Sequence, residues 1–343
     1  MPDSLAMMEA ARAMPEQFVT AVDAPSPLVD RPGASFNGVF IAGMGGSGIV
    51  GDVARVVVSP TSRIPVVTTK SDQCLGFIDE NSLVIISSFS GHTAEAIGIM
   101  TEAIDRGATV VAVSTGGRVA ELADEAGAPC WIVDGTIPCP RAALGALAVP
   151  VLRTLDHYGL FTVNDGRSLE FHLEATAKQL QARGNDFDRE DNPAARLARR
   201  IGRTIPLIYG ARALGEAAAI RWKSQFNENP KVPAFFGVVP ELTHNEICGW
   251  AQHGDMTRQV LTLVQLRHSF EGDRNAAAMD IVGEITDEVV AGVHEVRAEG
   301  DGMLAQFFDL VMMGDFVSLH LALAEGIDPG PVPVLDDIKT RLR

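Results

Sequence analysis

Cysteine is scarce in this chain, and long apolar runs are missing. The four cysteines form no CxxC pair and no zinc-like spacing with the few histidines, so we expect bystander thiols and no metal site. No run of about 18 apolar residues is present, which argues against a membrane-spanning helix. The N-terminus also lacks the cationic region and long apolar stretch of a signal peptide. These absences predict a cytoplasmic protein.

Basic residues are in the minority as well. The formal net charge of −16 argues against a protein that binds nucleic acid or an anionic membrane over a broad face. A single phosphate group needs only backbone N–H groups at a helix start and one or two cations. Small phosphorylated ligands are therefore compatible with this composition.

Short β-rich runs alternate with helical stretches in the first half of the chain, which is typical of a parallel, doubly wound sheet. The predicted strands are residues 38–44, 62–69, 82–89, 108–115 and 129–134. The same pattern returns later, with strands predicted at 204–211, 260–266 and 294–300 and a long apolar helix at 304–326.

The strand–turn–helix at 38–58 recurs in degraded form at 204–226, which indicates an internal duplication. At 343 residues the length also favours two domains. We expect an α/β fold of two Rossmann-like parallel-sheet domains, residues 1–152 and 199–343, joined by a helical connector at 153–198. Ligands of such sheets bind beyond the carboxyl ends of the strands, so we expect a site where loops of both halves meet.

The first candidate ligand loop is GMGGSGIVGD at residues 43–52, between a predicted strand and a helix. Its glycines allow close backbone approach, and Ser47 and the N–H groups of the helix start can donate to an anion. The loop also matches GxGxxG, so a dinucleotide-dependent oxidoreductase is an alternative. The acidic residue expected about 20 positions further on is missing, because Lys70 and Ser71 come first.

The second candidate loop is SSFSGHT at residues 87–93. Ser88, Ser90 and Thr93 could surround a phosphate, although a Ser/Thr helix cap is the ordinary interpretation of such a loop. Two hydroxyl-bearing loops after neighbouring strands, without a P-loop GKS/T sequence, favour a sugar phosphate over a nucleotide. Arg141, on a proline-bounded loop, could offer a fixed guanidinium to an oxyanion.

The segment at 223–250 is interrupted by three prolines, and its composition favours neither a helix nor a strand. Glu228 ends the preceding predicted helix, and His244 follows. A carboxylate and an imidazole could supply the base and the ring-opening group of an aldose–ketose isomerisation. Three other residues of the segment compete for these roles, and sequence does not rank them: Glu241, Glu246 and Lys231.

Five motifs in order, GMGGSG, SSFSGHT, PCPRAALG, FNEN and PELTHNEICGW, resemble the sugar isomerase (SIS) domain family. Within it, the chain is similar to the dual-specificity phosphoglucose/phosphomannose isomerases from about residue 35 almost to its end. The resemblance implies an isomerase that needs no cofactor and acts on glucose 6-phosphate, with mannose 6-phosphate as a further candidate, through a cis-enediol.

The resemblance also implies a role for each matching residue. The phosphate would lie on Gly46 and Ser47 with the hydroxyls of the second loop, and Arg141 would stabilise the enediolate. Glu228 would be the base. His244 would assist ring opening from the partner subunit of a homodimer, and Lys339, in a tail folded over the site, would act at the sugar ring.

The chain departs from the family pattern at two positions. His92 replaces an asparagine of the hydroxyl loop, and Val332 stands where family members that accept mannose have a threonine. An alternative from another class is a protein that binds a phosphosugar as a regulatory signal without chemistry. Such a sensor needs the phosphate loops but no base.

Overall fold

The computed structural model describes residues 3–30, 35–163, 165–187, 189 and 191–341, which fall into two compact units. The N-terminal unit comprises residues 13–178 and 301–305. The C-terminal unit comprises residues 1–12, 179–300 and 306–343. The domain boundaries predicted from the sequence are based on the internal repeat, whereas these units are defined by their compactness. They stay a prediction.

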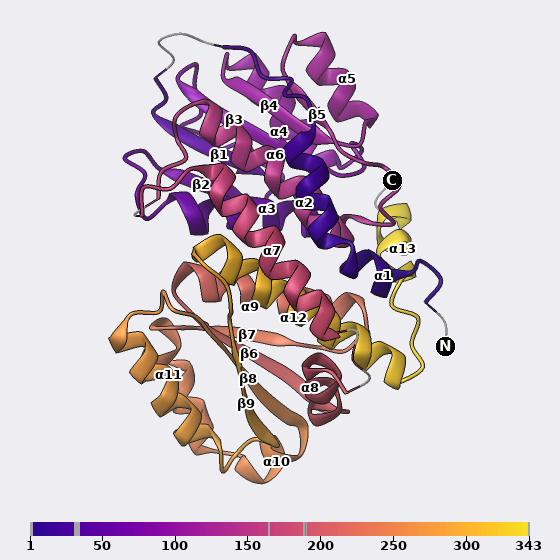
Figure 1. Ribbon diagram of the computed structural model, residues 1–343, viewed down its shortest axis with the longest axis vertical. Coiled ribbons are helices and arrows are strands. Elements are labelled where there is room, and N and C mark those ends of the chain that lie inside the picture. Colours follow the sequence, from indigo (N-terminus) through magenta and orange to yellow (C-terminus); the bar gives the residue numbers. More distant parts are fainter. Residues whose placement is uncertain (1–2, 31–34, 164, 188, 190, 342–343) are drawn as a thin grey trace. The chain divides into compact units, whose positions relative to one another are not determined.

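The N-terminal unit is built on a five-stranded parallel sheet with the order β2-β1-β3-β4-β5 (Figure 1). The strands are β1 (Gly38–Ala42), β2 (Val66–Thr69), β3 (Ser82–Ser87), β4 (Thr109–Ser114) and β5 (Cys130–Ile132). All residues of β1, β3 and β4 are buried. This explains their continuous apolar sequences, because a parallel sheet is covered on both faces. All five strands were predicted from the sequence.

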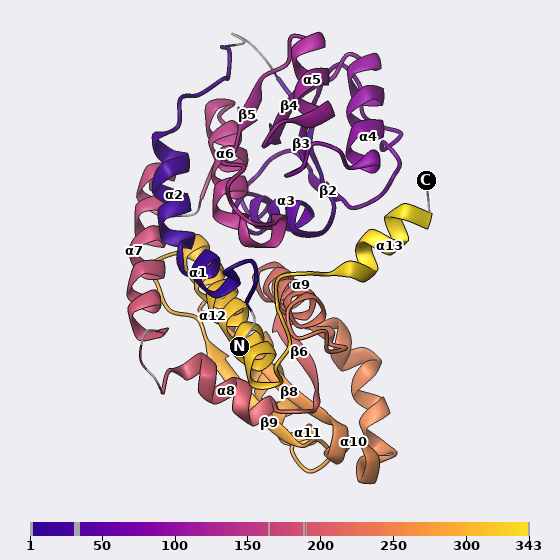
Figure 2. The same ribbon diagram turned by 90° about the vertical axis from the view of Figure 1, so that its right-hand side faces the viewer.

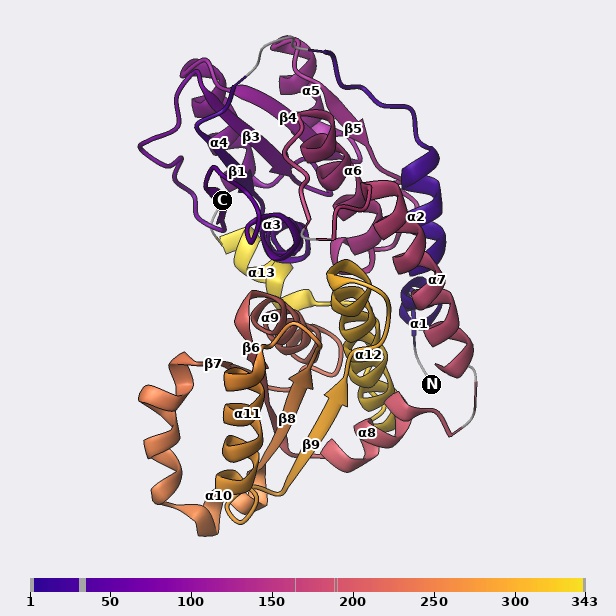
Figure 3. The ribbon, with the colours of Figure 1, turned by 60° about the vertical axis from the view of Figure 1, so that its left-hand side comes forward.

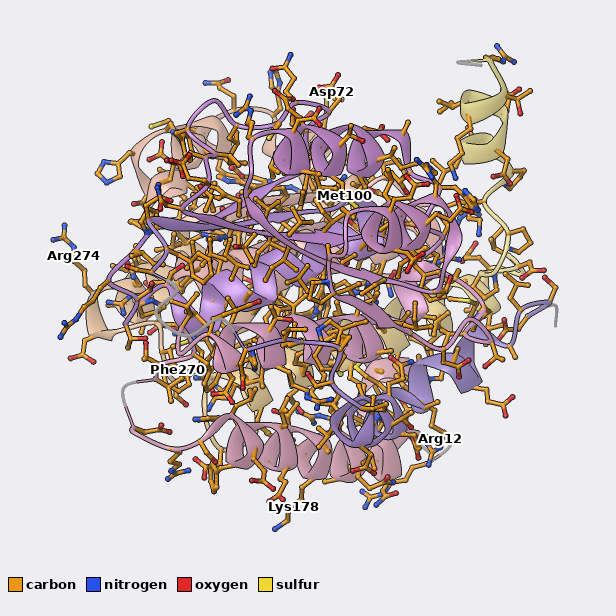
Figure 4. All side chains as sticks on the ribbon, turned by 90° about the horizontal axis from the view of Figure 1, so that it is seen from above. Arg12, Asp72, Met100, Lys178, Phe270 and Arg274 are labelled. Atoms are coloured by element: carbon orange, nitrogen blue, oxygen red, sulfur yellow. The ribbon has the colours of Figure 1, made fainter. Side chains whose placement is uncertain are left out.

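Helices cover both faces of this sheet (Figure 2). They are α2 (Met14–Asp23), α3 (Gly45–Val58), α4 (Ala94–Asp105), α5 (Gly117–Glu125), the short 3-10 helix η1 (Pro140–Ala142), α6 (Leu144–His157) and the first part of α7 (Leu169–Phe187). On one face, α4 and α5 pack their apolar side chains onto Val84 and Ile86 of β3. Met100 of α4, labelled in Figure 4, is fully buried in this layer.

The C-terminal unit has a four-stranded parallel sheet with the order β7-β6-β8-β9. The strands are β6 (Ile205–Ala211), β7 (Phe235–Val239), β8 (Leu261–Arg267) and β9 (Gly292–Arg297). The helices are α1 (Met7–Arg12), α8 (Pro193–Ile201), α9 (Arg212–Glu228), η2 (Glu241–His244), η3 (Glu246–Ala251), α10 (Gly254–Val260), α11 (Asp273–Thr286), most of α12 (Met303–Ala324) and α13 (Pro333–Arg341). Figure 3 shows α11 and α12 on opposite faces of this sheet.

The predicted duplication is visible in both sheets. The pair β1–α3 and the pair β6–α9 each consist of a strand and the helix that follows it, and β1 and β6 hold the same place in their sheets. The turn between strand and helix is also equivalent, because Gly45 (φ +54°) and Arg212 (φ +55°) both adopt the left-handed conformation. The fold class is therefore confirmed.

One sequence expectation is wrong. The segment at 223–250 contains the strand β7, which is only five residues long and is bounded by Pro233 and Pro240. Its position at the edge of the sheet makes such flanking prolines tolerable. In addition, α12 is long and apolar enough by composition to cross a membrane, but 83% of that apolar window is buried inside the protein. Such burial is typical of a core helix.

Candidate active site

The glycine-rich loop runs from the end of β1 into the first turn of α3. A Cβ atom on Gly43 would lie 2.8 Å from the carbonyl oxygens of Ser47 and Ser87, and one on Gly46 would lie 2.8 Å from the backbone nitrogen of Arg141. Real Cβ atoms do not approach backbone this closely. These glycines are thus required by close packing, which presses the loop against the segment that carries Arg141.

The two hydroxyl-bearing loops are joined by a hydrogen bond. The backbone N–H of Phe89 donates to Oγ of the buried Ser47 at 3.0 Å. The Ser47 hydroxyl keeps its own proton for a further acceptor, because this bond uses only a lone pair. The sequence prediction that the loops after β1 and β3 lie together is correct, since these strands are neighbours in the sheet.

Within the second loop the hydroxyl groups also contact one another and the backbone. Oγ of Ser88 donates to Oγ1 of Thr93 at 3.3 Å, and Oγ of Ser90 accepts from the backbone N–H of His92 at 3.3 Å. Ser88 is buried, whereas Ser90 is exposed and Thr93 is half-buried at the start of α4. The three hydroxyls, which differ in their exposure to solvent, and the start of α4 are thus groups that could bind an anion.

His92, the departure from the family asparagine, is exposed and lies against the neighbouring loop. Its Nε2 atom is 2.9 Å from the position that a Cβ atom of Gly117 would take. Gly117 has a φ of +68° and begins α5. The imidazole is therefore accommodated by a glycine on the adjacent turn.

Arg141 is buried on η1, and its segment is held by a side chain that sequence reasoning missed. Nε2 of the buried Gln17, in α2, donates to the carbonyl of Ala142 at 2.7 Å, and its Oε1 accepts from the N–H of Ala146 at 3.2 Å. A buried amide in an otherwise apolar helix face was the only available signal. Gln17 fixes the backbone next to Arg141.

A second unpredicted feature is a cation beside the glycine-rich loop. The Cε atom of Lys70, at the end of β2, would lie 3.3 Å from a Cβ atom of Gly48. Its ammonium forms an ion pair with the carboxylate of Asp52, a buried residue of α3. This pair ties β2 to α3 and places a positive charge next to the anion-binding turn.

In the C-terminal unit, Glu228 is the last residue of α9 and is half-buried. Asn227 and Asn229 flank it, and their side-chain amides donate to the carbonyl of Val232 at 3.0 Å and to Oγ of Ser318 at 2.9 Å. The FNEN motif therefore fixes the backbone on both sides of the carboxylate.

Lys231 was one of the alternative candidates for the catalytic groups of this segment, and the structure shows what its side chain binds. Nζ of Lys231 donates to four backbone carbonyls, those of Glu228, Asn229, Asp328 and Pro329, at 2.8 to 3.3 Å. Lys231 therefore satisfies the carbonyls at the end of α9, which is a structural role.

Two glutamates of the next segment also have hydrogen-bond partners. Glu241 accepts from the Asn245 side chain at 2.8 Å. Glu246 accepts from the hydroxyl of Tyr209, and burial together with this carboxylate strongly raises the pKa of the phenol. The carboxylates of Glu241 and Glu246 thus both accept hydrogen bonds from other side chains of the protein.

His244 and Lys339 are both exposed. His244 ends η2, and Lys339 lies on α13, in which no side chain is buried. Figure 2 shows α13 at the end of the chain, beyond α12. The structure thus brings together the predicted phosphate residues and Arg141 in the N-terminal unit, whereas Glu228, His244 and Lys339 lie on three elements of the C-terminal unit.

The C-terminal unit contains a degenerate copy of the phosphate loops. Leu214 takes the place of Ser47 in its strand–helix turn. Figure 4 labels Phe270 in the loop after β8 and Arg274 on the following helix α11. In this loop the buried carboxylate of Glu271 accepts from Nε of Arg267 at 3.1 Å and from the N–H of His268 at 2.8 Å. In this loop a carboxylate of the protein itself accepts hydrogen bonds, whereas the loop after β3 carries hydroxyl groups.

Solved structures of other proteins share the fold of this chain. The fold is that of the C-terminal domain of glucosamine-fructose-6-phosphate aminotransferase from Francisella tularensis (TM-score 0.68, 14% identity, 95% of this chain and 98% of that one). A glucose-6-phosphate isomerase like protein from Thermus thermophilus is also similar (TM-score 0.60, 20% identity, 98% and 100% covered). These likenesses show the fold, which consists of two parallel-sheet α/β units in one chain.

Sequence comparisons identify the protein family. Residues 190–342 match the family described as the bacterial phospho-glucose isomerase C-terminal SIS domain. The bifunctional phosphoglucose/phosphomannose isomerase of Caldicellulosiruptor bescii is 34% identical over 98% of both chains, and that of Aquifex aeolicus is 30% identical over 90% of this chain and 91% of its own. The chain belongs to the family of bifunctional phosphoglucose/phosphomannose isomerases.

Proposed function

We propose that this protein interconverts glucose 6-phosphate and mannose 6-phosphate with fructose 6-phosphate. The observation that carries the proposal is the relationship to bifunctional isomerases over nearly the whole chain, 34% identity with one of them. The joined hydroxyl loops and the buried Arg141 supply the local chemistry for a phosphorylated substrate. The regulatory alternative leaves Glu228 and its two fixed asparagine neighbours without a use.

The proposed reaction begins with phosphate binding and ring opening. The phosphate binds to the N–H groups at the start of α3, to Gly46 and Ser47, and to the hydroxyls of Ser88, Ser90 and Thr93. His244 protonates the ring oxygen O5, the bond between C1 and O5 breaks, and the anomeric hydroxyl gives its proton to water, which yields the open-chain aldehyde. Lys339 binds at the sugar ring.

The isomerisation itself is a proton transfer. The Glu228 carboxylate removes the proton from C2, and the electron pair moves toward the carbonyl to form a cis-enediolate at C1 and C2. Arg141 stabilises the negative charge on its oxygen. Glu228 returns the proton to C1, the O2 proton moves to O1, and the ketose is formed with all atoms and electrons conserved.

We further propose that the enzyme is a homodimer in which His244 reaches the site of the partner subunit. His244 is exposed in the single chain, and no side chain of η3 or α10 is buried. Four large apolar side chains of β7 and α10 are exposed nearby in sequence: Phe235, Phe236, Met256 and Val260. Burial of this apolar surface by a second copy would stabilise a dimer.

A coupled assay tests the proposal. Purified protein is supplied with glucose 6-phosphate or mannose 6-phosphate, and the formation of fructose 6-phosphate is followed. We expect turnover of both sugars. If neither sugar is converted although both raise the melting temperature, the regulatory function replaces the catalytic one.

A further inference from the structure

A cavity of about 350 Å³ lies at the β9 edge of the C-terminal sheet. Its walls come from α7, α8, β9 and α12. The lining residues are Arg183, Pro193, Arg196, Leu197, Arg200, Val293, His294, Glu295, Val296, Arg297 and Met313. None of them belongs to the candidate active site.

The position of this cavity reflects a difference between the two halves of the duplication. In the N-terminal unit, β5 pairs with β4 and covers its outer edge. In the C-terminal unit, β9 is the counterpart of β4, and among the described residues no fifth strand pairs with it. A sheet edge of this kind presents unpaired backbone donors and acceptors. The cavity therefore lies where the described part of the C-terminal sheet has no counterpart of β5.

The lining of the cavity is basic although the chain is acidic. Four arginines and one histidine face it, against a single carboxylate, that of Glu295. Nε and Nη2 of Arg183 donate to the two carboxylate oxygens of Asp309 at 2.8 and 2.6 Å, and Nε of Arg297 lies 2.6 Å from Glu295. Ion pairs with these carboxylates orient both guanidinium groups. In a chain of net charge −16, such a concentration of positive charge requires an explanation.

Two of the lining groups are without partners in the described part of the chain. Neither Arg200 nor the half-buried His294 forms a hydrogen bond or ion pair with a described residue. Arg196, one turn before Arg200 on α8, is by contrast bound to Asp191. Arg200 and His294 thus present a guanidinium fork and an imidazole to the same cavity.

We propose that this cavity is a second anion site, which binds a phosphate dianion, either free or as the monoester of a small metabolite. A planar guanidinium binds two phosphate oxygens at once, and an imidazole N–H can donate to a third. The volume is at the small end of the range for ligand pockets, which suits a compact phosphorylated molecule. The site is separate in sequence and structure from the phosphate loops of the N-terminal unit.

The imidazole makes the binding dependent on pH. Burial and the charge of Arg200 lower the pKa of His294 in the free protein. A bound dianion favours the imidazolium, so binding should take up a proton at His294 when the pH lies above the lowered pKa of this group. The other charged groups that face the cavity are Arg183 from α7, Arg196 and Arg200 from α8, and Glu295 and Arg297 from β9.

Isothermal titration calorimetry tests the proposal with glycerol 3-phosphate and, separately, inorganic phosphate as probes. The proteins are the wild type, Arg200→Ala and Arg203→Ala. Arg203 is exposed and outside the cavity lining, so its replacement removes the same charge as a matched control. We expect the wild type and Arg203→Ala to bind the probe at two sites per chain. Arg200→Ala should lose one site or bind there at least tenfold more weakly, with unchanged turnover of sugar phosphates.

The proposal is overturned if Arg200→Ala and Arg203→Ala bind the probe with the same number of sites and the same affinities. A single binding event in the wild type that persists in Arg200→Ala also overturns it. The two probes distinguish the sources of the phosphate: tighter binding of glycerol 3-phosphate indicates a monoester, and equal binding indicates free phosphate. Because isomerase activity is measured separately, failure here leaves the proposed catalytic function untouched.

Discussion

At the scale of single residues, the phosphate loops were predictable and their supports were not. Ser47, Ser88, Ser90 and Thr93 follow neighbouring strands, and the carboxyl ends of parallel strands meet at one edge of a sheet. Gln17 reaches Ala142 across 125 residues of sequence, and no local pattern reveals such a contact. Candidate ligand-binding residues could thus be predicted from the sequence where they follow neighbouring strands, and the distant side chains that support them could not.

Replacement of Gln17 by leucine should weaken both stability and catalysis. The change leaves the carbonyl of Ala142 without its buried donor, which costs roughly 1–3 kcal/mol of unfolding free energy. Because the backbone next to Arg141 loosens, kcat should fall more than substrate binding weakens. Urea denaturation and steady-state kinetics measure the two effects. Gln17→Glu, which keeps the acceptor for Ala146 but not the donor, should show the same loss of kcat. A leucine variant with unaltered kcat would contradict the positioning role.

At the scale of elements, strands with buried, continuous apolar sequence were predicted and the short edge strand β7 was not. Its first two residues, Phe235 and Phe236, are exposed, and prolines bound it, so neither burial nor length marks it as a strand. The pairing with β6 decides its conformation, and that is a tertiary effect.

The end of α9 depends on one lysine. Lys231 has a φ of +59° and satisfies four carbonyls with its ammonium group, so its conformation is strained but its side chain is well bound. Lys231→Ala should lower the unfolding free energy by about 1–3 kcal/mol and reduce kcat, because the helix end carries Glu228. Lys231→Gly loses the same hydrogen bonds but relieves the backbone, and should be about 1 kcal/mol more stable than the alanine variant. Equal stabilities of the two variants in urea would contradict the backbone argument.

Deletion of most of the terminal helix α13 should affect activity but not stability. None of its side chains is buried, so deletion of residues 336–343 should change the melting temperature little. If Lys339 acts at the sugar ring, turnover should be lost in the same variant and in Lys339→Met. Calorimetry and the coupled assay give the two readouts, with Arg341→Met as a control for loss of charge on the same helix. Unchanged turnover after the deletion would remove Lys339 from the mechanism.

At the scale of the whole molecule, the two copies of the duplicated fold carry different chemical groups in equivalent loops. The loop after β8 in the C-terminal unit carries the buried carboxylate of Glu271, whereas the equivalent loop of the N-terminal unit carries hydroxyl groups. The sequence repeat predicted the duplication, and only the structure identifies the buried carboxylate, because its partners come from the tertiary fold.

Stability should decrease in mild acid because three buried or half-buried histidines resist protonation. Burial is the main cause that lowers the pKa of His268, His294 and His320 in the folded protein. Below about pH 6.5 the unfolded chain therefore binds more protons than the folded one, and this contribution to stability is lost as the pH falls. His268 is the clearest case, since its Nε2 lies 2.9 Å from the carbonyl of Ala211 and its Nδ1 accepts from Phe270, an arrangement that fits only the neutral ring.

Urea midpoints at pH 7.5 and pH 5.5 measure this effect. The midpoint should be lower at pH 5.5, and His268→Asn should reduce the difference between the two pH values. An equal pH dependence in the variant would show that His268 does not contribute.

The most direct test of the account compares Glu228→Gln with Glu241→Gln in the coupled assay on glucose 6-phosphate. Both changes replace one carboxylate of the same segment by its amide. If Glu228 carries the proton between C1 and C2, kcat should fall by about 10²- to 10⁴-fold in Glu228→Gln and stay near the wild-type value in Glu241→Gln. The substrate should still raise the melting temperature of both variants. Wild-type kcat in Glu228→Gln would contradict the account.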